Sequence, residues 1–109
     1  MFLNPEEQAI ALLNDKKLSY DKRQFAIHYL AERPTPIAIK GLVSALRDSE
    51  FAVRWTAATA LAQLGILALP DVLRALMNPI RNTARLREGV LHILHYSSTI
   101  AHEPVYKHG

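Results

Sequence analysis

The sequence predicts an all-α fold: an α–α superhelix, or solenoid, of six helices arranged as three helical hairpins. Two residue types recur at nearly one period along the 109 residues. The prolines lie 34 residues apart and the arginines 31 and 33 residues apart: Pro36, Pro70 and Pro104; Arg23, Arg54 and Arg87. A fixed period of about 30 to 40 residues is typical of solenoids in which each repeat is one supersecondary unit. No run alternates in the way a strand requires.

Prolines mark the start of the first helix in each hairpin. Proline has a fixed φ and no N–H, which suits the first turn of a helix and no later turn. Asn4 precedes Pro5 as a good N-cap, and two acids follow at the positive end of the helix dipole. Thr35 repeats the cap one period later, and Leu69 is a weaker cap in the third hairpin. The first helices are predicted at 5–14, 36–47 and 70–78.

The second helix of each hairpin begins at a polar cap and carries an apolar face. The predicted caps are Ser19, Ser49 and Asn82. In the middle hairpin the apolar face follows helical spacing: Val53, Ala57, Ala60, Leu61 and Leu64. An offset of one repeat adds further core positions: Ala26, Leu30, Val90 and Leu94. The second helices are predicted at 20–32, 50–64 and 83–96.

Three glycines fit this arrangement of helices. Gly65 follows the middle hairpin and predicts a helix stop. Gly41 and Gly89 lie inside helices, where glycine costs about 1 kcal/mol relative to alanine. Their presence predicts that neighbouring helices approach closely at these two positions.

The composition predicts one folded domain with a continuous core. Half of the residues are apolar and 21% are charged, which is normal for a globular domain. The longest uncharged run, Trp55 to Pro70, is too short and too interrupted to span a membrane. The N-terminus lacks a signal-peptide pattern and there are no cysteines, so we expect a cytoplasmic protein without disulfides or thiolate metal sites.

The repeats are predicted at 5–33, 35–65 and 69–96, within a single domain that covers 1–109. Pro104 occupies the place of the earlier repeat prolines, so residues 97–109 are either a tail or a truncated fourth repeat. Six residues after position 103 are too few for a stable helix. We therefore expect a fragment of a longer solenoid or a last helix completed by a partner, and the alternative is a frayed tail. End-to-end pairing into a dimer also stays open.

The segment from Leu46 to Gly65 resembles a HEAT repeat of the short, phycobilin-lyase-like kind. The residues that carry this resemblance are Asp48, Val53, Arg54, Ala57, Leu61 and Gly65. The match is partial in the first repeat and weaker in the third, where Asn82 takes the place of Asp48. The resemblance covers residues 5 to 96. It implies a HEAT-like solenoid in which first helices lie on the convex side and second helices line the concave side.

The resemblance gives the aspartate and arginine columns a structural role. We expect adjacent repeats to be joined there by a ladder of charges and hydrogen bonds. Its members are Asp48, Arg23, Arg54 and Arg87. A role in ligand binding is the less favoured alternative.

The concave face is where we expect a partner to bind. Three columns of the second helices lie opposite the core: Gln24, Trp55 and Glu88; His28, Thr59 and His92; Glu32, Gln63 and Tyr96. The predicted partner-binding residues are Gln24, His28, Trp55, Thr59, Gln63, Glu88, His92 and Tyr96. Tryptophan and tyrosine are typical anchors of binding hot spots. Alternatively, the sole tryptophan, Trp55, packs between helices.

No catalytic site and no cofactor site is predicted. Glu88, His92 and His95 share one helix face and are weak candidates for a divalent metal. The pair His102–Glu103 is similar to one of the iron-binding pairs of deoxyhypusine hydroxylase, but the other helices lack such a pair. There is no glycine-rich phosphate loop and no nucleophile–histidine–acid arrangement. The interpretation we favour is a non-enzymatic scaffold that binds a protein or peptide.

Nucleic acid is the main rival partner, and a fragment of a lyase-like HEAT enzyme is another alternative. The net charge is +3 and the isoelectric point about 9.5. Basic residues that could neutralise phosphates cluster at Lys16, Lys17, Lys22, Arg23, Arg74, Arg81, Arg85 and Arg87. The excess is small, because 13 basic residues face 10 acidic ones.

Overall fold

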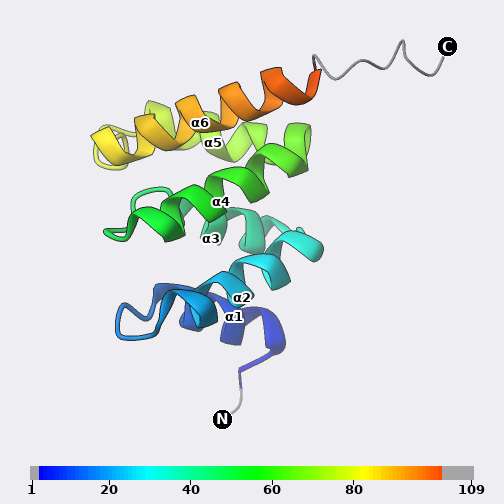
Figure 1. Cartoon of the computed structure of the whole chain (residues 1–109), viewed down its shortest axis with the longest axis vertical. Coiled ribbons are helices and arrows are strands. Elements are labelled where there is room, and N and C mark those ends of the chain that lie inside the picture. The colour runs from blue at the N-terminus through cyan, green and yellow to red at the C-terminus, as the bar shows by residue number, and fades with distance from the viewer. Residues whose placement is uncertain (1–2, 102–109) are drawn as a thin grey trace, which may run out of the picture.

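The computed structural model describes the backbone of residues 3–101 and the side chains of residues 3–96. The six predicted helices are present (Figure 1): α1 Pro5–Asn14, α2 Tyr20–Glu32, α3 Pro36–Ala45, α4 Phe51–Leu64, α5 Leu69–Met77 and α6 Ala84–Ala101. A short 3₁₀ helix, η1 Gly65–Leu67, joins α4 to α5. The described residues contain no strand. The start of a fourth repeat that Pro104 would mark and the pair His102–Glu103 lie outside the described residues.

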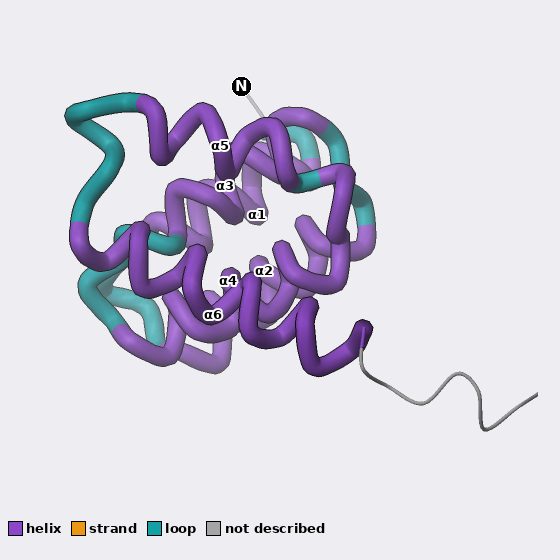
Figure 2. The backbone as a smooth tube through the Cα atoms, turned by 90° about the horizontal axis from the view of Figure 1, so that it is seen from above, coloured by secondary structure: helices purple, strands orange, loops and turns teal. Residues whose placement is uncertain are grey.

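The helices form two layers of three. Figure 2 shows α1, α3 and α5 on one side and α2, α4 and α6 on the other, and the hairpins stack one after another along the chain. The helices of the second layer pack more closely against one another than α1, α3 and α5 do. In a curved stack the inner helices must lie closer together, so this difference agrees with a concave side lined by α2, α4 and α6.

The predicted starts of α1 and α3 are confirmed. The Asn4 side-chain oxygen accepts the Glu7 N–H at 2.8 Å, and Thr35 Oγ1 accepts the Ala38 N–H at 3.1 Å. In both helices proline occupies the first turn. Helix α5 has no side-chain cap, as the weak cap at Leu69 predicted, and it begins one residue earlier than predicted.

Two predicted N-caps are wrong by one residue. The residue that caps α4 is Glu50 rather than Ser49, because the Asp48 carboxylate already accepts the Glu50 N–H at 2.9 Å. In α6, Thr83 Oγ1 accepts the Leu86 N–H at 3.2 Å. Asn82, the predicted cap, instead donates to the Leu76 carbonyl at 2.9 Å.

Three predicted helix ends are also wrong, that of α5 by one residue, at Met77 rather than 78. Helix α3 stops at Ala45 rather than 47, because the next backbone bonds are of the tighter i→i−3 kind that lead into the loop at Asp48. Helix α6 continues to Ala101 rather than stopping at 96. No glycine or proline follows Tyr96 before Pro104, so the sequence contains no strong stop signal there.

The core lies between the two layers and is continuous through the three hairpins. The predicted face of α4 is confirmed, because Val53, Ala57, Ala60 and Leu61 are buried and Leu64 is partly buried against the core. The prediction is wrong at Leu94, which is 60% exposed. Its counterparts in α2 and α4 are covered by the next hairpin, whereas no later helix among the described residues packs against α6. The largest fully buried apolar residues are Leu13, Ile27, Leu30, Leu42, Leu46, Leu61, Leu86 and Val53.

The structural reason for a glycine differs among positions 65, 89 and 41. Gly65 ends α4 with a φ of +58°, a conformation that side chains other than glycine rarely adopt. Gly89 lies against Leu46, and a Cβ at this position would come within 2.9 Å of the Leu46 Cδ2 atom. The prediction of close approach is therefore confirmed at Gly89. It is wrong at Gly41, where a Cβ would meet Ile10 at an ordinary contact distance of 3.5 Å.

Within residues 3–101, no single helix combines the length and apolar character needed to cross a bilayer. Two consecutive segments, Phe51–Leu67 and Leu69–Met77, reach that length and composition only together, and they are bent by 112° relative to each other.

Candidate functional site on the face of the second helices

A row of aromatic rings crosses from α4 to α6. The Trp55 side chain is 50% exposed, and its ring lies over the ring of His92 with their centroids 3.4 Å apart. Phe51, one turn before Trp55, stacks on it with a centroid separation of 5.9 Å. On α6, Tyr96 follows His92 by one turn, at a centroid distance of 6.5 Å. Trp55 therefore packs between helices with one part of its ring and exposes the rest.

Two polar contacts fix the register between these helices. Thr59 Oγ1 lies 3.2 Å from His92 Nε2, and the Gln63 side-chain amide donates to the Tyr96 hydroxyl at 3.3 Å. Both pairs are 33 residues apart in the sequence. Thr59 and His92 belong to one predicted column, and Gln63 and Tyr96 to another. The structure thus places the members of these two columns side by side where they come from the second and third hairpins.

The aromatic row is uncharged near neutral pH. Burial lowers the pKa of His92 below its ordinary value, and the positive charge of nearby His95 lowers it further. The ordinary value of histidine is about 6.5, so His92 is neutral at pH 7. A neutral ring can accept or donate a hydrogen bond to Thr59 and still present an apolar surface to Trp55.

Small cavities flank Trp55 on both sides. One has a volume of about 170 Å³ and lies over α4 and α6, where Glu88, Gly89 and His92 form part of its wall. The other has a volume of about 250 Å³ and is lined by Tyr20, Phe51, Ala52 and Trp55. Cavities of this size accept one apolar side chain of a partner rather than a whole ligand.

Phe51 was not among the predicted site residues, although it is 64% exposed and borders both cavities. Its position at the start of α4 places it outside the predicted columns. The signal that could have found it is its spacing of four residues from Trp55, which puts both rings on one helix face.

The first hairpin contributes little to this cluster. Gln24 is partly buried and His28 is exposed. No hydrogen bond, ion pair or ring contact joins either of them to the aromatic row in the part of the chain that the structure describes. The polar contact between these two hairpins is instead a hydrogen bond between the Tyr20 and Thr56 hydroxyls. Glu32, in the third predicted column, is paired with the adjacent Arg33 at 3.5 Å.

The weak metal candidates are Glu88, His92 and His95. Among the described residues, no group of three or more histidine, cysteine, aspartate or glutamate side chains is arranged to hold an ion. His92 is engaged with Trp55 and Thr59.

The joint between the first two hairpins contains the charged contact expected of the ladder. Arg23 of α2 is only 1% exposed and pairs with the carboxylate of Asp48, which precedes α4. The same guanidinium donates to the Leu13 carbonyl at 2.9 and 2.7 Å. Lys16 approaches Asp48 at 3.0 Å from the solvent side.

Burial alone would raise the pKa of Asp48. The hydrogen bonds from Arg23, the Glu50 N–H and Lys16, with the charge of Arg23, outweigh burial and lower the pKa below its ordinary value. The Asp48 carboxylate therefore stays ionised inside the joint.

The other ladder arginines bond within their own hairpins. Arg54 donates to the Asp48 carbonyl at 2.8 Å, and Arg87 donates to the Asn82 side chain at 2.9 Å. The third hairpin has Asn82 where the second has Asp48, so no carboxylate draws Arg54 across the next joint. Within the described residues, the ion pairs that the ladder residues make between hairpins all lie at the first joint: Arg23 with Asp48 and with Glu50, and Lys16 with Asp48.

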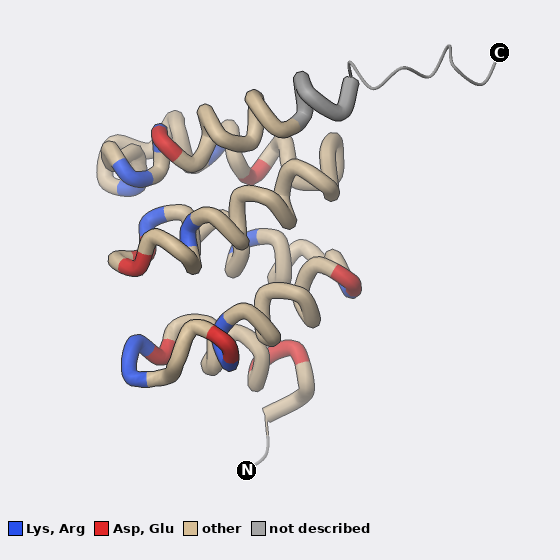
Figure 3. The backbone as a smooth tube through the Cα atoms, viewed as in Figure 1, with Lys and Arg blue, Asp and Glu red and all other residues tan. Residues whose placement is uncertain are grey.

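Basic residues gather along the edge where the loops within the hairpins lie (Figure 3). Some of them are already engaged: Arg23 is buried, Lys16 is paired with Asp48, and Arg74 is paired with Asp71 at 2.9 Å. Arg81 and Arg85, near the start of α6, are exposed. Arg23 in particular is unavailable to a phosphate.

The comparisons with known proteins agree with this geometry. The family model of HEAT repeats matches residues 6–92, most of the chain. No curated protein and no solved structure matches the sequence.

Proposed function

The chain belongs to the HEAT-repeat family, and from that premise we propose that it is a non-enzymatic scaffold that binds a partner protein on the face of its second helices. HEAT repeats generally mediate interactions between proteins. Stacked repeats present an extended and rigid surface, so binding costs little ordering of the scaffold itself.

The observation that carries the proposal is the half-exposed Trp55 with a cavity on either side. Large apolar patches on a surface mark interaction sites, and tryptophan with adjoining pockets is typical of a hot spot. Phe51 and His92 hold the Trp55 ring in place, so little side-chain entropy is lost when a partner covers it. We propose that an apolar side chain of a partner helix or peptide enters one of these cavities.

The test is a pull-down from native lysate with the wild-type chain and with the double variant Trp55→Ala/Tyr96→Ala. We expect nuclease-treated lysate to yield a protein that the wild type retains and the variant loses. Removal of a hot-spot aromatic costs about 2 kcal/mol or more, which is at least a roughly thirtyfold loss of affinity.

The matched control is Phe25→Ala, because Phe25 is an aromatic residue of α2 that is exposed outside the row. This variant should retain the partner. Equal retention by wild type and Trp55→Ala/Tyr96→Ala would contradict the proposal, and thermal melts of all three proteins separate lost binding from lost folding.

Nucleic acid is the second candidate partner. The observation that favours it is the group of exposed arginines near the start of α6, Arg81, Arg85 and Arg87, on a chain with net charge +3. Phosphate contacts make such binding strongly dependent on salt. A mobility shift with duplex DNA and RNA at low salt that showed no complex would remove this candidate.

A further inference from the structure

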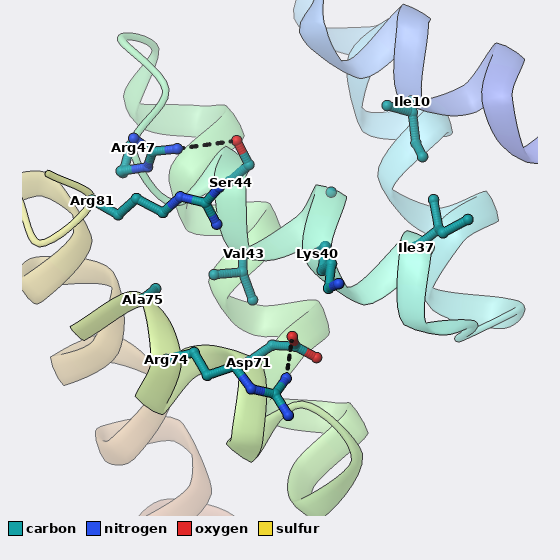
Figure 4. Close-up of a pocket in the computed structure, with 11 residues that line it drawn as sticks. Ile10, Ile37, Lys40, Val43, Ser44, Arg47, Asp71, Arg74, Ala75 and Arg81 are labelled. Carbon is teal, nitrogen blue, oxygen red and sulfur yellow. Dashed lines mark hydrogen bonds and ion pairs between the residues drawn. The ribbon is translucent and has the colours of Figure 1, made fainter. Parts of the chain in front are cut away.

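The first-helix face carries a groove that is separate from the aromatic row. Its volume is about 640 Å³, and α1, α3 and α5 all contribute to its walls. Figure 4 shows its lining, in which Lys40, Ser44 and Arg47 lie on or just after α3, and Asp71 and Arg74 lie on α5. Arg81 reaches it from the loop between α5 and α6. No residue of this groove lines the cavities beside Trp55.

The groove concentrates the positive charge of the protein. Four cations line it, Lys40, Arg47, Arg74 and Arg81, against the single acid Asp71. Four positive charges and one negative charge give +3, which equals the net charge of the whole chain. A concave site of one sign focuses the field and raises the local concentration of ligands of opposite charge.

Three of these cations lack an acidic partner. Asp71 pairs with Arg74 at 2.9 Å, which neutralises that arginine. In the described part of the chain, Lys40, Arg47 and Arg81 make no ion pair, and Arg47 only donates to the Ser44 hydroxyl at 3.4 Å. Their charges therefore remain available to a ligand.

The opposite end of the groove is apolar. Ile10 of α1 and Ile37 of α3 lie together there, and Ile37 is 57% exposed (Figure 4). Arg47 and Arg81 lie at the far end, with Val43 between the two ends. A ligand that fits both ends has acidic groups and an apolar group on one extended framework.

We propose that this groove binds an acidic peptide segment of a partner protein. Its carboxylates pair with Arg47 and Arg81, whose planar guanidinium groups match a carboxylate with two parallel hydrogen bonds. Lys40 binds a further carboxylate as a point charge, and an aliphatic side chain of the peptide covers Ile37. A nucleic acid backbone fits less well, because it has no apolar group for Ile10 and Ile37.

The test measures the fluorescence anisotropy of a fluorescein-labelled peptide of about ten alternating glutamate and leucine residues, at an ionic strength of about 0.02 M, where charge screening is weak. We expect the wild-type chain to bind this peptide. The variant Arg47→Gln/Arg81→Gln should bind it at least about tenfold more weakly, and Ile37→Gln should weaken it by a smaller factor. The same peptide with glutamine in place of glutamate should not bind.

The matched control is Lys17→Gln/Arg85→Gln, which removes the same charge at exposed positions outside the groove. It should change the affinity by less than about threefold, the effect of weakly coupled surface charges. An equal loss in both double variants would overturn the proposal in favour of general charge attraction, and so would failure of the wild type to bind.

Two further measurements distinguish an acidic-peptide site in this groove from binding at the aromatic row and from a nucleic-acid site. Trp55→Ala should bind the peptide as the wild type does, so a failure of the aromatic row as a binding face leaves this result intact. Labelled duplex DNA that bound more tightly than the peptide, and that was lost in Arg47→Gln/Arg81→Gln, would assign the groove to nucleic acid and overturn the peptide proposal. The single variant Arg81→Gln, at an exposed position, repeats the test if the double variant does not fold.

Discussion

Arg23 is the residue on which the joint between the first two hairpins depends most. It is buried, and it joins Leu13 of its own hairpin to Asp48 of the next. All the buried side-chain polar atoms in the described residues have partners, so the joint contains no unsatisfied group. Removing one member of such a pair leaves a charge buried without compensation, which is costly even where the intact pair contributes little.

The first prediction compares Arg23→Met with Arg87→Met. We expect Arg23→Met to lower the free energy of unfolding by about 3 kcal/mol, because Asp48 and the Leu13 carbonyl lose their main partner. Arg87 is exposed and bonds only to Asn82, so Arg87→Met should cost less than about 1 kcal/mol. Urea unfolding measures both. Similar losses in the two variants would show that Arg23 does not hold the joint.

A second residue-scale prediction uses Trp55 as a built-in probe of His92. A protonated imidazole quenches indole fluorescence more strongly than a neutral one, and the two rings are in contact. Burial and His95 lower the pKa of His92, so the fluorescence should fall only as the pH decreases below the ordinary value of about 6.5. His92→Gln should remove this step, whereas His28→Gln should keep it. A step that persisted in His92→Gln would assign the titration to another group.

The helix starts show which boundaries can be predicted from capping residues in the sequence and which cannot. Asn4 and Thr35 predicted the starts of α1 and α3 because a cap, a proline and the first turn are all local in the chain. The caps of α4 and α6 shifted by one residue because Asp48 and Asn82 use their side chains in other short-range hydrogen bonds, with the Glu50 N–H and the Leu76 carbonyl, which compete with the simple capping pattern. Gly41 and Gly89 both lie inside helices and look alike in the sequence, but only at Gly89 does the packing leave no room for a Cβ.

The element-scale prediction is a matched pair, Gly89→Ala and Gly41→Ala. Both gain up to about 1 kcal/mol of helix propensity. In Gly89→Ala the new methyl group meets the fully buried Leu46, and overpacking of this kind costs about 1 to 3 kcal/mol, so a net loss of stability is expected. Gly41→Ala has room beside Ile10 and should be more stable than the wild type. Thermal melts show whether each variant is more or less stable than the wild type. Higher stability in both variants would mean that α6 shifts freely away from Leu46.

For the whole molecule, the two layers create two different surfaces. The second-helix layer presents neutral aromatic rings, and the first-helix layer presents a basic groove. The third hairpin also exposes large apolar residues on both of its helices and in the loop between them: Leu73, Met77, Ile80, Leu91 and Leu94. An exposed apolar face on a repeat favours packing against another repeat or another copy of the chain.

We therefore expect the chain to self-associate as its concentration rises. Sedimentation velocity should show dimers that dissociate on dilution, and Leu91→Lys/Leu94→Lys should be monomeric at the same concentrations. The control Phe25→Lys adds a charge at an exposed apolar residue of the first hairpin and should still dimerise. A monomeric wild type at all concentrations would contradict the expectation of end-to-end pairing.

The sequence by itself determined the repeat, the number and order of the helices, and the register that brings Thr59 beside His92, because periodic spacing and helix caps are local properties. Only the tertiary structure decided which members of a column meet. Arg23 reaches Asp48 while Arg54 stays in its own hairpin, Leu94 is exposed while Leu61 is buried, and Phe51 joins the aromatic row. The basic groove was not predicted either. Lys40 and Arg74, and Arg47 and Arg81, are each 34 residues apart, but only the packing of three hairpins decides that they line one groove and that Arg74 pairs with Asp71. The physical reason is that burial and charge pairing depend on neighbours about 30 residues away, whose approach is set by packing rather than by the local pattern.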